Sequence, residues 1–185
     1  MRTGILVVLA GLLPAVAQAH TGHELSGFWA GLLHPLTGLD HLLAFFCAGL
    51  WLAHGSKAAS LTMGAGFLLA LLLGAGAGLM GLMIPQVEQG ILLSLLVLGG
   101  MVIMQQRLAS HWLTMLCGAL LVMHGMVHGL EIPQAASAIS YLSGFLLASA
   151  VLFSTGLLVA QLSPRLLVQS LGAMVAATGL WFSLI

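Results

Sequence analysis

The sequence predicts an all-α membrane protein with six transmembrane helices, because charged residues are rare and the apolar runs are long. Charged residues make up 4% of the 185-residue chain and apolar residues 61%, and the mean hydropathy is +1.16. The four Lys/Arg and four Asp/Glu are too few to cover the surface of a soluble domain. Several apolar runs reach about 20 residues, the length that a helix needs to cross a bilayer. The expected surrounding is therefore lipid, and the net charge of zero gives no indication of nucleic acid as a partner.

The first 19 residues have the pattern of a secretory signal peptide. Arg2 provides the positive start, residues 4–16 provide the apolar stretch, and residues 17–19 form an A-x-A cleavage site. The alternative is an uncleaved first helix, but Pro14 and the short apolar core argue against it. We therefore expect residues 1–19 to be removed and residues 20–185 to form a single transmembrane domain with its N-terminus outside.

The mature chain contains six apolar segments separated by short interruptions, which leave no room for a second domain. The predicted spans are residues 27–54, 60–83, 89–106, 111–130, 138–161 and 165–185. With the N-terminus outside, every Lys and Arg of the mature chain falls in an inner loop and every Glu in an outer one. This distribution obeys the positive-inside rule. The residues concerned are Lys57, Arg107, Arg165, Glu24, Glu88 and Glu131.

A weak internal echo is compatible with an inverted repeat of three plus three spans. Residues 66–70 of the second span and residues 144–148 of the fifth share the sequence Gly-Phe-Leu-Leu-Ala. Inverted repeats are common in membrane proteins that move solutes, although five apolar residues also recur by chance in such a chain.

The first span is too long for a single straight helix, and we expect it to be broken near Pro35. Residues 25–54 as one helix would extend about 45 Å, against a hydrocarbon core of about 30 Å. Pro35 disfavours helical geometry at His34, and Gly38 loosens the next turn. Asp40 and His41 then lie on the first turn of the continuing helix, inside the membrane.

The fourth span carries a second pair of histidines. His124 and His128 are four residues apart, which places them on one helix face about 6 Å apart and allows both imidazoles to bind one metal ion. Gly125 and Gly129 repeat at the same interval and would let a neighbouring helix approach closely. Because this span runs outward, its histidines lie in the outer half of the membrane, at the same depth as His41. The sequence therefore predicts one intramembrane site made from both spans.

Structural explanations stay open for some of these polar residues. An intramembrane aspartate costs about 2.5 kcal/mol or more, so Asp40 and a histidine could form a purely structural pair. His20, His23 and Glu24 precede the first span, where they could capture metal at the entrance or simply be solvated terminal residues.

The sulfur-containing residues give little indication of function. Cys47 and Cys117 fall in apolar runs and form no CxxC motif, so they are expected to be small buried residues without a disulfide. Methionines could favour copper, but those of the third and fourth spans follow no fixed spacing. They are Met101, Met104, Met123 and Met126.

Two stretches resemble the motifs of the HupE/UreJ family of hydrogenase and urease accessory membrane proteins. Residues 34–45 read HPLTGLDHLLAF and contain the H-P-x-x-G-x-D-H motif in full. Residues 123–133 read MHGMVHGLEIP and match a motif of the type F-H-G-x-A-H-G-x-E, except at the apolar positions Met123 and Val127. Together with the signal peptide and HTGHELSGFWAG, the resemblance covers essentially the whole mature chain.

The resemblance implies a bacterial inner-membrane permease that imports Ni²⁺, or Co²⁺ in some members, from the periplasm for hydrogenase or urease maturation. Histidine and carboxylate ligands suit Ni²⁺, Co²⁺ and Zn²⁺ alike, so nickel rests on the resemblance alone. The metal would be the transported ion, and neither a prosthetic group nor an enzymatic activity is expected. The alternatives are an intramembrane metal-dependent hydrolase and a metal receptor that does not transport. The expected ligands are His34, Asp40, His41, His124 and His128, with Glu131 in the layer behind them.

Overall fold

The computed structural model describes residues 27–53, 57–105, 111–134 and 136–184, which form helices joined by short connections. Five helices are long and apolar enough to cross a membrane, and α2 with α3 forms a bent pair that counts as a sixth span. The protein is therefore a multi-pass helical membrane protein, as predicted. The expected signal peptide lies outside the described residues. The helices are α2 (Gly27–Thr37), α3 (Leu39–Leu52), α4 (Lys57–Leu79), α5 (Val87–Met104), α6 (His111–Leu130), α7 (Ala138–Leu162) and α8 (Arg165–Leu184).

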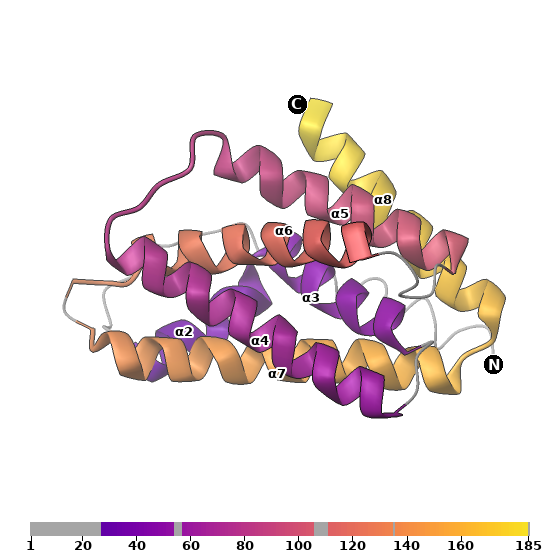
Figure 1. Ribbon diagram of the computed structural model, residues 1–185, viewed down its shortest axis with the longest axis horizontal. Coiled ribbons are helices and arrows are strands. Elements are labelled where there is room, and N and C mark those ends of the chain that lie inside the picture. Colours follow the sequence, from indigo (N-terminus) through magenta and orange to yellow (C-terminus); the bar gives the residue numbers. More distant parts are fainter. Residues whose placement is uncertain (1–26, 54–56, 106–110, 135, 185) are drawn as a thin grey trace.

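Helix α3 forms the centre of the bundle. Helix α4 packs mainly on α6, α5 packs on α8, and both α2 and α3 pack on α7. Figure 1 shows α3 running between α5 and α8 on one side and α7 on the other. Ten of its 14 residues are buried, which makes this short helix the core on which the others pack. The proposed three-plus-three repeat stays a prediction.

The contact between α4 and α6 depends on glycines from both helices. A Cβ atom added at Gly74 or Gly78 of α4 would overlap a backbone carbonyl oxygen of α6. A Cβ added at Gly125 or Gly129 of α6 would overlap a carbonyl oxygen of α4 in the same way. The close approach predicted for Gly125 and Gly129 is therefore confirmed. Such packing is a main source of helix association in lipid, where no hydrophobic force drives two helices together.

The first span is broken as predicted, at Gly38, three residues after Pro35. Helix α2 continues through Pro35 to Thr37, so the expectation that His34 would leave helical geometry was wrong. The Thr37 hydroxyl donates to the carbonyl oxygens of Leu33 and His34, at 3.1 and 3.0 Å, and satisfies the helix end. Packing of α2 on α7 stabilises this last turn, and it offsets the local cost of one proline.

The second span also ends earlier than predicted, at Leu79. Gly81 has a φ of +78°, which a residue with a side chain rarely adopts. The N–H groups of Gly81 and Leu82 bond to the carbonyl oxygens of Gly78 and Ala77, at 2.8 and 3.1 Å. These two bonds are those of a Schellman motif, which terminates helices.

Candidate metal centre

The bend between α2 and α3 brings two histidines of the first motif together. The two helices are bent by 78° at the break, and the rings of His34 and His41 lie 6.3 Å apart between centroids. Gly38 at the bend is closely surrounded, since an added Cβ would lie 3.1 Å from Asp40 Oδ1 and 3.2 Å from His41 Nδ1, and both side chains would have to shift slightly. The break thus turns both imidazoles toward the same side of the bundle.

The histidines of α6 complete a cluster of four imidazoles. The ring centroid of His41 lies 4.3 Å from that of His128 and 4.9 Å from that of His124. The rings of His34 and His128 are 4.6 Å apart. His124 and His128 are both 0% exposed, and His41 is also buried. The two motifs, predicted to form one site, therefore lie together, with His128 at the centre of the cluster.

The carboxylate of Asp40 is hydrogen-bonded to His41. Its Oδ1 accepts a hydrogen bond from the backbone N–H of His41 at 2.9 Å and lies 2.8 Å from Nδ1 of the same residue. Because a carboxylate can only accept a hydrogen bond, Nδ1 is assigned the proton and Nε2 the lone pair. Nε2 of His41 is buried and has no hydrogen-bond partner in the described part of the chain. Asp40 thus orients the ring and keeps one nitrogen free to bind a metal.

Ser94 of α5 orients the ring of His124 and keeps one of its nitrogens free. Its hydroxyl donates to the carbonyl oxygen of Ile91 at 2.6 Å and lies 2.8 Å from Nε2 of His124. Since the single hydroxyl proton is already used, Nε2 of His124 donates to Ser94, and Nδ1 carries the lone pair. Nδ1 of His124 and both ring nitrogens of His128 are buried without a partner among the described residues. Unpaired buried nitrogens cost about 1–3 kcal/mol each, a cost that a bound ion would remove.

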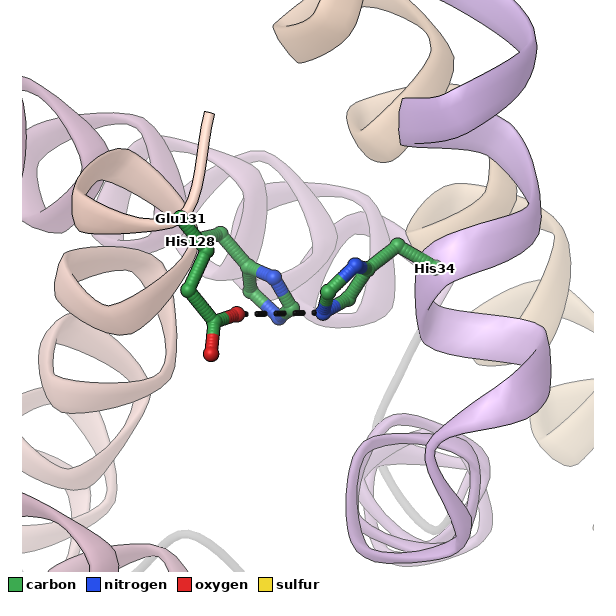
Figure 2. A group of neighbouring side chains, drawn as sticks. All are labelled: His34, His128 and Glu131. Atoms are coloured by element: carbon green, nitrogen blue, oxygen red, sulfur yellow. Dashed lines mark ion pairs between the residues drawn. The ribbon is translucent and has the colours of Figure 1, made fainter. Parts of the chain in front are cut away.

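A second group of ligand atoms faces outward and shares His128 with the first. Figure 2 shows His34 reaching from α2 toward His128 of α6 and toward Glu131, which directly follows α6, with an ion pair between Glu131 and His34. The distance from His34 Nε2 to Glu131 Oε2 is 3.2 Å. One ligand atom from each of the three residues lies within 4.8 Å of the others, which is close enough for one ion. Glu131, expected behind the ligands, thus stands beside them with its carboxylate half-exposed.

The cluster lies at the base of an acidic cavity of about 470 Å³. Its polar lining includes His34, His41 and the carboxylates of Asp40, Glu88 and Glu131, and no lysine or arginine is among the lining residues. The remaining lining comes from α3, α5, α6 and the end of α8. A cavity lined by carboxylates concentrates cations at its base.

Phe45 closes the opposite side of the cluster. It lies one turn below His41 on α3 and is fully buried. Its ring centroid is 5.9 Å from that of His41 and 5.4 Å from that of His124. The rings of Phe67 and Phe145 pack against it from α4 and α7, at 5.3 and 6.1 Å. In this conformation His34 and His41 line the cavity, whereas His124 and His128 are fully buried behind them and Phe45 packs below the cluster.

The sequence did not single out three residues of this region as site residues. Glu88 had served only to assign topology, although an acidic residue at the outer end of a span was a usable signal. Tyr141, the single tyrosine of the chain, lies 6.2 Å from His34 between ring centroids, and its buried hydroxyl has no described partner. Ser94 carried no signal, because nothing local distinguishes it from a serine bonded to its own helix. The predicted capture residues His20, His23 and Glu24 lie outside the described residues.

Comparisons with known proteins agree with the motifs. The family model described as HupE / UreJ protein matches residues 7–182. The chain is also similar to Protein HupE of Rhizobium leguminosarum bv. viciae, with 36% identity over 160 residues that cover 85% of this chain and 83% of that protein. No solved structure matches the chain. On the family match and this identity, the chain belongs to the HupE/UreJ family.

Proposed function

We propose that this protein is a permease that imports a divalent transition metal ion, Ni²⁺ or Co²⁺, from the periplasm across the bacterial inner membrane. The observation that carries the proposal is the convergence of four imidazoles from three helices at the base of an acidic cavity. Family membership supports an accessory role in nickel or cobalt transport for hydrogenase or urease. Nickel as the preferred ion follows from the resemblance, since imidazole and carboxylate ligands do not select it.

The arrangement suggests two successive positions for the ion. The outer position uses His34, His128 and Glu131, where a cation from the cavity can still keep some of its water. The inner position would use His41 with His128 and His124, whose rings lie 4.3 and 4.9 Å from that of His41. These rings must shift to bind one ion, because among the described residues only the outer group has its ligand atoms within 4.8 Å of one another. Because His128 belongs to both groups, the ion can exchange ligands one at a time and is never without an imidazole. Asp40 acts mainly through His41, and its charge offsets part of the charge of the ion.

Transport requires a second conformation that opens the inner side. Phe45, packed between the imidazoles and the rings of Phe67 and Phe145, is the barrier that must move. Alternating movement of helices around a central site is the usual mechanism of secondary transporters. The driving force would be the membrane potential, a proton gradient or trapping of the metal inside the cell.

The decisive experiment is uptake of radiolabelled Ni²⁺ into proteoliposomes, with Co²⁺, Zn²⁺ and Cu⁺ as competitors. We expect uptake that Co²⁺ inhibits, and we expect His128→Ala to lower the uptake rate by about 100-fold or more, because it removes the ligand shared by both positions. Thr178→Ala is the control, since among the described residues this hydroxyl bonds only to the Met174 carbonyl oxygen of its own helix.

Other outcomes would identify the alternative functions. Tight binding without uptake would indicate a metal receptor. Metal-dependent product formation in a lipid extract, again without uptake, would indicate an intramembrane hydrolase. Uptake by His128→Ala at the parent rate would remove the histidine cluster from the pathway.

Metal affinity is expected to weaken as the pH falls from about 8 to about 5, because a protonated imidazole has no lone pair for a metal. Metal binding displaces protons from histidine, so acid favours the metal-free form. Equilibrium dialysis of the purified protein with Ni²⁺ at constant ionic strength measures this dependence. A constant affinity over the whole range would contradict ligation by histidine.

A further inference from the structure

Three buried sulfur atoms lie on the far side of Phe45 from the histidine cluster. Cys47, Met101 and Cys117 come from α3, α5 and α6 and are 0%, 3% and 4% exposed. Cys117 Sγ lies 3.5 Å from Met101 Sδ. Cys47 belongs to the same cluster of buried core residues as Met101, Cys117 and Phe45. The same three helices supply His41, Ser94 and His124 to the histidine cluster.

On each helix the sulfur-bearing residue lies six or seven positions from the residue that contributes to the histidine cluster. Cys47 is six residues along α3 from His41, and Met101 is seven residues along α5 from Ser94. Cys117 precedes His124 by seven residues on α6, which runs in the opposite direction. At 1.5 Å per residue, each sulfur-bearing residue lies about 9–10.5 Å deeper in the bundle. Seven residues are almost two turns, so Met101 and Cys117 occupy the same helix faces as the residues above them.

The separation of two of the sulfur atoms is compatible with binding to one ion. Two sulfur ligands of a tetrahedral metal at about 2.3 Å lie about 3.8 Å from each other. Thiolate and thioether ligands bind softer and borderline transition metals, and they follow carboxylates and imidazoles in increasing softness. Simple core packing accounts for a single buried cysteine. It does not explain three sulfur-containing residues from the same helices that build the histidine cluster, all at one depth below it.

We propose that Cys47, Met101 and Cys117 form a second metal-binding site, which accepts the transition-metal ion after it has passed Phe45. This inference rests on the proposed transport function for its place in the pathway, but the binding site itself can be tested separately. Each thiol that coordinates the ion forms a metal–sulfur bond and releases its proton to water, so binding is accompanied by proton release.

Cobalt is the probe that distinguishes sulfur from nitrogen ligands. Titration of the purified, reduced full-length protein with Co²⁺ should produce a near-ultraviolet charge-transfer band, which only thiolate ligation generates. The double variant Cys47→Ser/Cys117→Ser should lose this band and retain the visible absorption of cobalt bound to histidine. Met101→Leu, which preserves volume, should weaken the Co²⁺ affinity that is measured from this band by about tenfold. The matched control is Met126→Leu, since Met126 is equally buried but packs against α4.

The kinetic consequence is measured in proteoliposomes. We expect the double variant to lower the maximal uptake rate by about tenfold and to leave the half-saturating metal concentration within about twofold, because access from the cavity is unaffected. Absence of the band in the parent protein, or its persistence in the double variant, would overturn the sulfur site. If the double variant does not fold, the two leucine variants still test the sulfur site. Met101→Leu should bind Co²⁺ at this site more weakly than Met126→Leu does.

The two proposals fail in different ways. A cobalt–thiolate band in a protein without uptake would leave the sulfur site standing and refute transport. Histidine-dependent uptake without a band would refute only the sulfur site.

Discussion

Asp40→Asn should lower metal uptake by about 10- to 100-fold while the protein stays folded, because the carboxylate sets the protonation state of His41. An asparagine amide can donate to Nδ1 of His41 instead of accepting from it. The proton of the ring would then move to Nε2, the nitrogen that is buried without a partner. The ion would also lose a nearby negative charge. Uptake rate and thermal stability should be measured on the same purified sample.

The free energy of unfolding is expected to change by only about 1 kcal/mol in this variant. Asp40 lies in the first turn of α3, where a negative charge is favourable by about 0.3–1 kcal/mol. Removing a charge from the membrane interior stabilises the folded protein, which opposes that loss. That gain is reduced here, because the side chain is 32% exposed to the cavity and already hydrogen-bonded.

Glu88→Gln is the matched control for this prediction. It removes the same charge from the same cavity, but Glu88 makes no described hydrogen bond to any of the four histidines. We expect it to lower uptake much less than Asp40→Asn does. Equal losses would mean that charge alone matters. Full-rate uptake by a destabilised Asp40→Asn variant would show that Asp40 is purely structural.

Gly125→Ala should destabilise the protein by about 1–3 kcal/mol or more, because the added Cβ would overlap the Leu71 carbonyl oxygen of α4. Backbone atoms cannot move aside as a flexible side chain can, so α4 and α6 must separate. That movement would displace His124 and His128 relative to His41, and metal affinity should fall with stability. Denaturant titration in detergent micelles and equilibrium dialysis with Ni²⁺ measure the two effects.

Gly118→Ala on the same helix provides the control. A Cβ added at Gly118 meets no atom within 4 Å. Alanine is favoured over glycine in a helix by about 0.8–1 kcal/mol, so this variant should be as stable as the parent or more stable. If the two alanine variants proved equally stable, the proposed role of glycine packing between α4 and α6 would be wrong.

The spans, the broken first helix and the pairing of His124 with His128 could be predicted because they depend on local sequence. Apolar length determines which segments can cross a membrane. Helical periodicity places His124 and His128 on one face whatever surrounds them. The break was placed near Pro35 from local preferences alone. Gly38, where the break lies, was itself a local signal, whereas the continuation of α2 through Pro35 to Thr37 follows from no local preference.

The role of each polar residue in the candidate site depends on contacts between helices. The sequence predicted Asp40 as a metal ligand, and in the structure its carboxylate is hydrogen-bonded to His41. Glu131 was expected behind the ligands, and its carboxylate lies beside His34. Ser94 becomes a partner of His124 only because α5 packs on α6. Side-chain pairs between helices follow from the rotation and register of each helix, which are set by packing.

The sequence by itself determined that this is a helical membrane protein of the HupE/UreJ type with histidines on two of its spans. Those features follow from composition, periodicity and motifs, which need no knowledge of the neighbouring helices. Only the tertiary structure decided that His128 lies between His34 and His41, and that Cys117 Sγ comes within 3.5 Å of Met101 Sδ. The physical reason is that close glycine contacts and the bend at Gly38 fix how the helices face one another, and these act across the bundle.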